Sequence, residues 1–452
     1  MSDEGCGRRG INAIIILAAG RGISYIYRSV MYLKKILLPL FVALVACGGD
    51  DGPRPGEPTK VVLWEFGGVP GLRDWVQQAV EDFNAERSDI YIELEFRDWA
   101  TQRESLISTT IVGDGPDIVR VHHKYSVEFG ELGGLYPLDG FADFPAAKER
   151  ILDNLWEHVA YDGQHYGLPI QVLPFIMAVN QDLLNRHGLA IPLTWEDMMA
   201  LGPVLKEQGI YAFTTPAGLN QDTAYRFLPL LYKAGGRVFN DDWTKAAFNG
   251  PAGRAALEFL VSMKEQGFMP PACAAYAFDE NAALWCTEKA ALSIEGPWWQ
   301  NAVLSNYDFP LQKVRLIKLP GPAVPPGPHP SRTLLDLVMV AITGYSQVPE
   351  EAWTVIKALW LDDPQWHTPD PLMGGFPAQK VAYASGVESG FIDGEVLAAA
   401  GQNGLAWPGH PAITQIQRSM ADALNMAMSG TLSPKEALDQ AAAEVDEILE
   451  DY

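Results

Sequence analysis

The chain has 452 residues, of which 48% are hydrophobic and 20% are charged, a composition typical of folded globular proteins. Its length predicts more than one hydrophobic core, because single cores rarely organise more than about 250–300 residues. A formal net charge of −23 repels phosphate backbones and argues against nucleic-acid binding.

A candidate targeting signal occupies residues 31–47. Lys34 and Lys35 precede an apolar stretch, residues 36–46, which is too short to span a bilayer as a helix. Small residues then lead into Cys47. This order resembles a bacterial lipoprotein signal, which implies cleavage before Cys47 and acylation of its thiol. We therefore expect a signal peptide at residues 31–46 and a protein anchored by lipid on the periplasmic or extracytoplasmic face of the bacterial envelope.

The segments that flank this signal are interpreted from it. Residues 1–30 precede a complete signal and are interpreted as a non-native extension, with translation starting at Met31. Within them, residues 14–22 resemble the first strand and glycine loop of sugar nucleotidyltransferases, but the signal follows within nine residues and leaves no room for that fold. Residues 47–59 are polar and rich in Gly and Pro, which favours a flexible tether.

Strands and helices are expected to alternate from residue 60 onward. Residues 60–64 predict a strand, since Lys60 is followed by four apolar residues, and apolar residues then recur at helical spacing from Leu72 to Phe83. Residues 90–96 alternate between apolar and polar side chains, as strands do, and residues 117–121 predict a third strand. Strand, helix and strand at this spacing form a βαβ unit, which predicts the α/β class.

Local signals for helix starts and loops continue along the chain. Residues 194–197 and 433–436 each begin with a hydroxyl residue and carry an acid three positions later, the pattern of a helix N-terminus. Residues 320–330 contain six prolines in eleven positions and predict an extended loop.

Two cysteines, Cys273 and Cys286, lie in the body of the chain. No CxxC or Cys/His cluster accompanies them, so we expect neither a metal site nor a cofactor. In an oxidising compartment these cysteines could pair and close a 14-residue segment, and we expect this disulfide. The alternative is two small buried hydrophobic residues.

Nine short segments occur in an order that matches a known family. They are residues 62–65, 115–119, 133–139, 162–169, 180–184, 192–197, 233–241, 289–298 and 429–438. Together they resemble the family 1 extracellular solute-binding proteins, whose best-known members bind maltose and trehalose. The resemblance extends from about residue 60 to residue 450 and covers nearly the whole mature chain.

The resemblance implies a periplasmic-binding-protein-like (type II) fold with two α/β lobes and a ligand cleft between them. By analogy, residues 60–168 and 336–370 form lobe 1, whereas residues 171–333 and 371–452 form lobe 2. It also implies a monomer that captures a carbohydrate and delivers it to the permease subunits of an ABC importer. Lobe closure over the ligand would be the signal that the permease reads.

Aromatic rings stack on the flat C–H faces of sugars, and polar side chains bond their hydroxyl rim. Trp298 matches the stacking tryptophan of the family, whereas its neighbour Trp299 is expected in the core. Trp64 and Glu65 end the first strand, and residues at strand ends often line ligand crevices, although Trp64 fits a core position equally well.

The resemblance also implies a ligand contact at Gln171, but Leu173 stands where relatives often carry a carboxylate, which argues against simple maltose-type recognition. Asp336 follows the second crossover between the lobes. Gly375 and Trp407 lie in the C-terminal part, where relatives contribute their last cleft residues.

A second departure from the family pattern follows the third expected strand. Many relatives carry an acid or a tryptophan there, whereas this chain has His122, His123, Lys124 and Tyr125. These side chains could give cationic and hydroxyl contacts to an acidic sugar, and a solvated surface is the alternative. A metal site on the two histidines is disfavoured, because adjacent side chains on a strand diverge.

Catalysis is not indicated by motifs in the mature chain. It contains no Gly-x-Ser-x-Gly elbow, HExxH helix or phosphate-binding loop. The leading hypothesis is a substrate-binding lipoprotein of an importer. The alternatives are a binding lipoprotein that serves a sensor or adhesion without transport, and a glycoside hydrolase, which needs only two facing acids.

Overall fold

The computed structural model describes residues 57–67, 70–329, 332–367, 374–388 and 404–452. The chain divides into two units, Met1–Glu57 and Pro58–Tyr452, and the second unit contains all the elements described below. The expected extension, the signal peptide and Cys47 lie outside the described residues.

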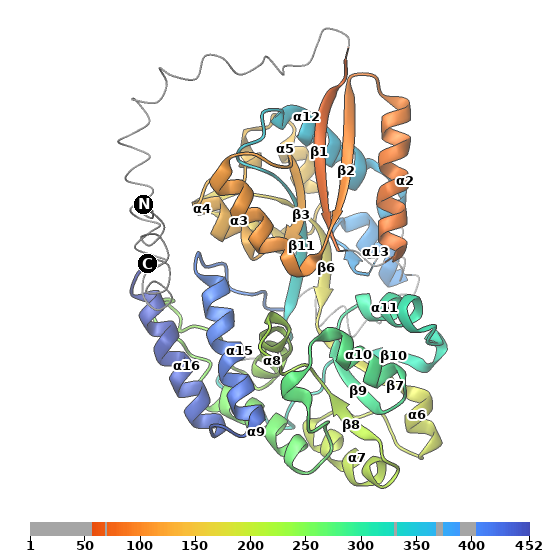
Figure 1. Cartoon of the computed structure of the whole chain (residues 1–452), viewed down its shortest axis with the longest axis vertical. Coiled ribbons are helices and arrows are strands. Elements are labelled where there is room, and N and C mark those ends of the chain that lie inside the picture. Colours follow the sequence, from red (N-terminus) through yellow and green to blue (C-terminus); the bar gives the residue numbers. More distant parts are fainter. Residues whose placement is uncertain (1–56, 68–69, 330–331, 368–373, 389–403) are drawn as a thin grey trace, which may run out of the picture. The chain divides into compact units, whose positions relative to one another are not determined.

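A mixed six-stranded sheet organises the first lobe (Figure 1), with the strand order β12-β6-β11-β3-β1-β2. Strand β1 pairs in parallel with β2 and β3, whereas β11 runs antiparallel to β3 and β6. The carboxyl ends of β1 and β3 therefore meet at one edge, where β11 begins. The strands are Thr59–Phe66 (β1), Ile90–Arg97 (β2), Ile118–His122 (β3), Leu168–Pro174 (β6), Leu335–Ile342 (β11) and Phe376–Pro377 (β12).

Helices pack on this sheet around one hydrophobic core. The expected strand–helix–strand start is confirmed, since β1, α2 and β2 follow one another and α2 buries its apolar positions from Leu72 to Phe83. The helices are Pro70–Glu86 (α2), Gln102–Val112 (α3), Tyr125–Glu131 (α4), Phe144–Glu149 (α5), Pro349–Ile356 (α12) and Lys380–Glu388 (α13), and a short hairpin joins Ala160–Tyr161 (β4) to Gln164–His165 (β5).

The second lobe contains a four-stranded sheet with the order β10-β7-β9-β8. Its strands are Ile176–Asn180 (β7), Tyr211–Thr214 (β8), Ala290–Glu295 (β9) and Val314–Ile317 (β10). Its helices are Gln181–Arg186 (α6), Trp195–Glu207 (α7), Gln221–Lys233 (α8), Pro251–Glu265 (α9), Phe278–Cys286 (α10), Trp298–Tyr307 (α11), Ile413–Ser429 (α15) and Pro434–Leu449 (α16). Capping boxes start α7 at Thr194 and α16 at Ser433, as the sequence predicts.

The boundaries between the lobes differ from those inferred by analogy. Residues 171–174 belong to β6, which pairs with β11 inside the first sheet, so the chain enters the second core only at Phe175. Strand β12 and Ala378 also join the first core, although residues 371–452 were expected in lobe 2. The cause is sheet pairing, because β12 adds to the free edge of β6.

The expected disulfide is not formed, because Cys273 and Cys286 are free thiols. Cys273 lies in the main core of the second lobe, whereas Cys286 packs at the edge of a separate small cluster that contains Trp285 and Trp299. Burial raises the pKa of the Cys273 thiol to about 11 and that of Cys286 to about 12. The alternative interpretation, two small hydrophobic residues, describes them better.

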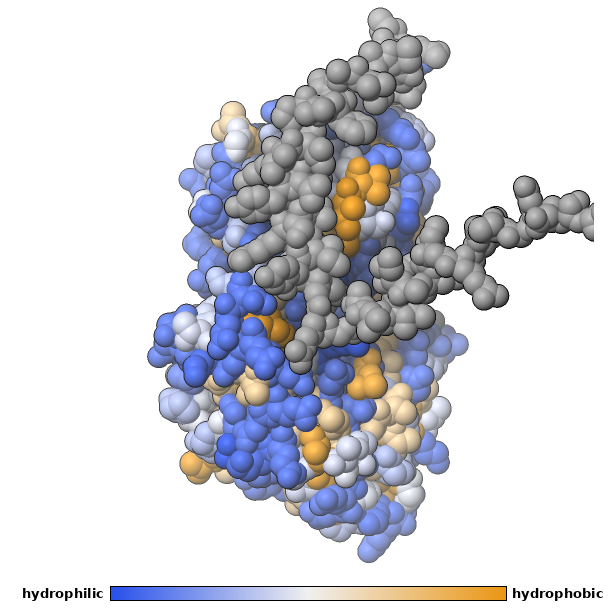
Figure 2. All heavy atoms as spheres, turned by 60° about the vertical axis from the view of Figure 1, so that its left-hand side comes forward, coloured by the Kyte–Doolittle hydropathy of each residue, from blue (hydrophilic) through white to orange (hydrophobic). Residues whose placement is uncertain are grey.

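The surface seen in Figure 2 is mainly hydrophilic where the residues are described, with scattered hydrophobic side chains. None of the helices in the described ranges combines the length and apolar character needed to cross a membrane. Within the same ranges, no group of three His, Cys, Asp or Glu side chains is arranged to hold a metal ion.

Candidate functional site

Trp298, the first residue of α11, packs against the hydrophobic cores of both lobes. Its half-buried ring lies 5.3 Å from the ring of Phe175 in an edge-to-face arrangement. A Cβ atom at Gly296 would lie 1.9 Å from this ring, so the glycine is required for the ring position. The two lobes meet around Trp298 and between the end of β3 and the helices α8 and α15. We call this region the lobe junction.

Three buried side chains form a polar group where β1 and β3 end in the first lobe. Glu65 and Arg120 are neighbours in the β1–β3 register, and Arg120 Nη1 donates to Glu65 Oε1 at 2.7 Å. The other terminal nitrogen of Arg120 donates to Gln171 of β6. Burial raises the pKa of Glu65 to about 7, against the opposing effect of Arg120. Glu65 thus holds the guanidinium group in place.

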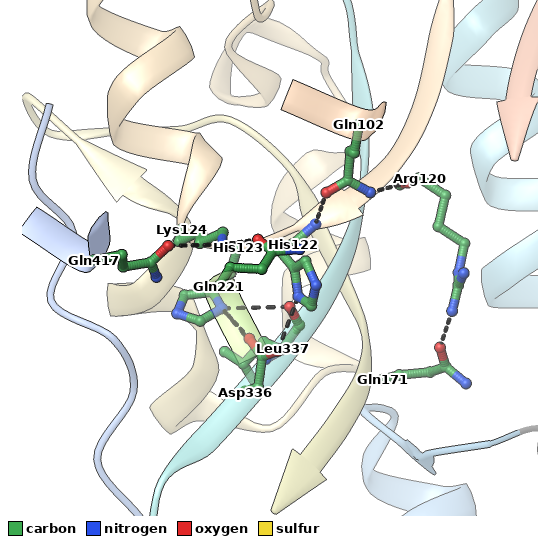
Figure 3. A network of polar contacts seen from close by, with 10 residues as sticks. All are labelled: Gln102, Arg120, His122, His123, Lys124, Gln171, Gln221, Asp336, Leu337 and Gln417. Atoms are coloured by element: carbon green, nitrogen blue, oxygen red, sulfur yellow. Dashed lines mark hydrogen bonds and ion pairs between the residues drawn. The ribbon is translucent and has the colours of Figure 1, made fainter. Parts of the chain in front are cut away.

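Two histidines share one carboxylate at the neighbouring strand end (Figure 3). Asp336, near the start of β11, lies 2.9 Å from His122 Nδ1 and 3.2 Å from His123 Nδ1. All three side chains are buried. Burial lowers the pKa of His122, and the adjacent histidines hold the pKa of Asp336 below its usual range despite its burial. The Gln102 side chain accepts a bond from the His122 backbone N–H at 3.3 Å.

Lys124 reaches from the first lobe into the second. Its Nζ donates to Gln417 Oε1 of α15 at 3.0 Å and to Gln221 Oε1 of α8 at 3.3 Å (Figure 3). The same nitrogen lies 4.8 Å from the centre of the Tyr225 ring, also in α8. The residue is only 1% exposed, and burial lowers its pKa to about 8. A buried ammonium group therefore connects the two lobes.

A second buried arginine–glutamate pair lies in the second lobe. Arg226 of α8 donates from Nη2 to Glu295 Oε2 at 2.8 Å, and Glu295 is the last residue of β9. The other oxygen of Glu295 accepts from Asn281 at 3.0 Å and from Ser293 at 2.9 Å. The Arg226 guanidinium carbon lies 5.2 Å from the Phe175 ring centre and 5.7 Å from that of Trp298. Glu295 therefore positions Arg226 beside the aromatic residues of the junction.

Aromatic rings from both lobes line this junction. Trp99, half-buried in the first lobe, lies 4.5 Å from the ring of His122. His122 in turn lies 5.8 Å from the ring of Tyr225, which belongs to the second lobe. Trp407 supports Tyr225 from the core side at 5.5 Å. Aromatic rings and charged side chains from both lobes thus lie close together at the junction.

Residues 70–366, about two thirds of the chain, match the sequence model of the family described as bacterial extracellular solute-binding protein. The chain belongs to this family. A binding protein of Brucella abortus (strain 2308) is 23% identical over 419 residues, which cover 92% of this chain and 97% of that protein. The family membership inferred from the nine segments is therefore confirmed.

Solved structures of solute-binding proteins share the fold. One, an ABC transporter solute-binding protein of Thermotoga lettingae with bound α-D-tagatose, aligns with a TM-score of 0.75 at 24% identity, covering 86% of this chain and all of that one. A second, the maltose-bound MalE3 of T. maritima, aligns with a TM-score of 0.75 at 19% identity and covers 86% of this chain and 100% of its own. The expected two-lobed α/β fold is confirmed.

This solute-binding protein brings most of the sequence-predicted site residues to the lobe junction or beside it. Glu65 and Gln171 meet through Arg120, and His122 and His123 meet through Asp336. Gly375 lies against Gln171, since a Cβ atom there would lie 3.1 Å from Gln171 Nε2.

Burial bears on two other expectations. Trp64 packs in the first core, with Arg97 over its ring at 3.8 Å, which agrees with its alternative core assignment, and its contact with a ligand stays a prediction. A solvated surface for the segment from His122 to Tyr125 is wrong, because all four of its residues are buried.

Several junction residues were missed by sequence reasoning: Trp99, Arg120, Gln221, Tyr225, Arg226 and Gln417. Two of them could have been identified from their sequence context. Arg120 interrupts a buried strand and Arg226 interrupts an otherwise apolar stretch of α8, and buried arginines are rare unless they are paired. Gln221 and Gln417 offered no such signal, because glutamine is common on exposed helix surfaces.

Proposed function

We propose that this protein is the extracytoplasmic substrate-binding component of an ABC importer and that it captures a carbohydrate between its two lobes. The observation that carries the proposal is Trp298, a half-buried ring that packs against both cores beside the paired Arg226. The tagatose and maltose in the two aligned structures support this ligand class. A ligand that touches both lobes would stabilise the closed form selectively.

Ligand screening by thermal shift tests the carbohydrate assignment. A ligand present at a hundred times its dissociation constant stabilises a protein by about 2.7 kcal/mol, which is easily seen. We expect one class of sugar to raise the melting temperature, and Trp298→Ala to lose most of that shift. Trp243→Ala is the matched control, because Trp243 is 45% exposed and its ring contacts Phe239 instead. No response to any mono- or oligosaccharide, sugar acid or polyol would reject the assignment.

The proposed membrane anchor is the acylated thiol of Cys47, followed by the tether of residues 47–59. Its support is the order of basic, apolar and small residues before this cysteine. The wild-type protein should partition into detergent, whereas Cys47→Ala should remain in the aqueous phase. We further propose that the protein acts as a monomer.

Transport and sensing can be separated in cells. Loss of uptake of the identified sugar after deletion of the gene would favour delivery to a permease. Retained uptake with an altered signalling or adhesion response would favour a binding lipoprotein without transport.

A glycoside hydrolase is a weaker candidate, although burial raises the pKa of both Glu65 and Glu295 to about 7. Raised carboxyl pKa values suit a general acid. Both carboxylates are, however, 0% exposed and bonded to arginine, so neither presents an open face to a glycosidic oxygen. Release of reducing ends from the bound oligosaccharide would establish hydrolysis instead.

A further inference from the structure

The basic side chains of the lobe junction differ in whether a carboxylate lies beside them. Arg120 has Glu65 at 2.7 Å, and Arg226 has Glu295 at 2.8 Å. His122 and His123 share Asp336. Each of these groups has a buried carboxylate within ion-pair distance. The charges of the two arginines are therefore balanced by the protein itself.

Lys124 is the exception in the described part of the chain. Its ammonium group is bonded to two neutral amide oxygens, those of Gln221 and Gln417. No carboxylate of the described residues lies within ion-pair distance, which is 4.0 Å, of this nitrogen. Asp336, Glu128 and Asp222 act on it from farther away, and Arg103 opposes them. Burying an ammonium group without a close counter-ion is unfavourable.

The donors around Lys124 are not all used within the described residues. An ammonium group has three N–H donors, and the two glutamines account for two of them. The side-chain nitrogen of Gln417 is also buried, and its side chain acts on the hydroxyl group of Tyr225 at the same junction. Lys124 and Gln417 come from different lobes, so an acceptor bonded to both would join the lobes.

From this geometry we propose that the ligand is an acidic carbohydrate, whose carboxylate accepts hydrogen bonds from Lys124 and Gln417. The inference rests on the proposed carbohydrate function and specifies its substrate class. A carboxylate supplies the counter-ion that Lys124 lacks, and hydrogen bonds between charged partners are the strong ones. The sugar ring would then stack on the aromatic residues of the junction, with Trp298 beside the second arginine pair.

Matched sugar pairs test this proposal by titration calorimetry. The probes are glucose and glucuronate, galactose and galacturonate, and the corresponding disaccharides with and without a carboxylate. Because a hydrogen bond to a charged group contributes on the order of 10- to 150-fold in affinity, the acidic member of the binding pair should bind tighter by about that factor. Lys124→Met should remove most of this preference, measured as the ratio of the acidic to the neutral affinity in the same variant.

The control variant is Lys233→Met. Lys233 is also a buried lysine of the lobe that contributes Gln221, and burial likewise lowers its pKa to about 8, but it lies at the other end of α8. This variant should keep the acid preference. A neutral sugar that binds as tightly as its acid, or a preference that survives Lys124→Met, would overturn the inference and leave the carbohydrate function standing. Binding of no sugar of either kind would overturn both.

Discussion

Arg226 and Glu295 in the second lobe repeat the arrangement of Arg120 and Glu65 in the first. In both pairs a glutamate at a strand end, 0% exposed, holds an arginine that is 4% exposed. The two arginines arise from different elements, one from strand β3 and the other from helix α8. Each lobe thus brings its own neutralised cation to the junction.

Removing one partner of such a pair should be far more harmful than removing both. Glu295→Ala leaves the guanidinium of Arg226 buried and unpaired, and should lower the free energy of unfolding by about 3–5 kcal/mol. The double variant Arg226→Met/Glu295→Leu should recover most of that loss, because apolar side chains of similar volume replace the pair. Urea unfolding of the two variants measures both values.

The exposed pair Lys60–Glu93 provides the control for this comparison. Its side chains are 58% and 44% exposed, so Glu93→Ala should change stability by less than about 1 kcal/mol. Equal effects of Glu93→Ala and Glu295→Ala would contradict the role of the buried pair.

Replacing either of the two adjacent tryptophans at the start of α11 should affect stability and ligand binding to different extents. Trp299 is 0% exposed in a cluster with Trp285 and Phe309, so Trp299→Ala should cost about 3–5 kcal/mol of stability. Trp298 is only half-buried, and its replacement by alanine should be milder for folding but should weaken ligand binding on the order of 30-fold. Paired melting and binding curves provide the check. Similar melting temperatures for the two variants would contradict these assignments.

Local sequence patterns were sufficient for much of the fold and for little of the site. The alternation in β2 and the capping box at Ser433 are determined by nearby residues, and both were predictable. The pairing of Arg120 with Glu65 depends instead on the register between strands 55 residues apart. No local pattern contains that information.

The predicted disulfide was wrong for the same reason, because it depends on the distance between residues in the fold. Bridging requires two Cα atoms within about 7 Å, and a separation of 13 positions along the chain does not determine that distance. Cys273 and Cys286 fold into different hydrophobic clusters. The glutamines that bind Lys124 likewise come from helices far apart in the sequence, which only the fold brings together.

The cross-lobe bond between Lys124 and Gln417 should favour the closed form before any ligand binds. Gln417→Leu removes an acceptor of a buried ammonium group, and such bonds contribute about 1.5–3 kcal/mol. The ligand-free variant should therefore show a larger radius of gyration by small-angle X-ray scattering. Gln440→Leu on the exposed surface of α16 is the control and should scatter like wild type. Unchanged scattering of Gln417→Leu would show that other contacts, such as Glu128 with Thr414, hold the lobes together.

The lowered pKa of Lys124 predicts a pH dependence of stability with a definite sign. Burial lowers the pKa to about 8 from an ordinary value of 10.5, so between these values the unfolded chain binds the proton more tightly. Stability rises with pH wherever the unfolded state holds more protons. Relative to Lys124→Met, the free energy of unfolding of the wild type should therefore increase from pH 8 to pH 10.5, by at most about 1.4 kcal/mol per pH unit. Parallel curves for the two proteins, measured by urea unfolding, would mean that Lys124 titrates as an ordinary solvated lysine and that its ammonium group is not buried between the lobes.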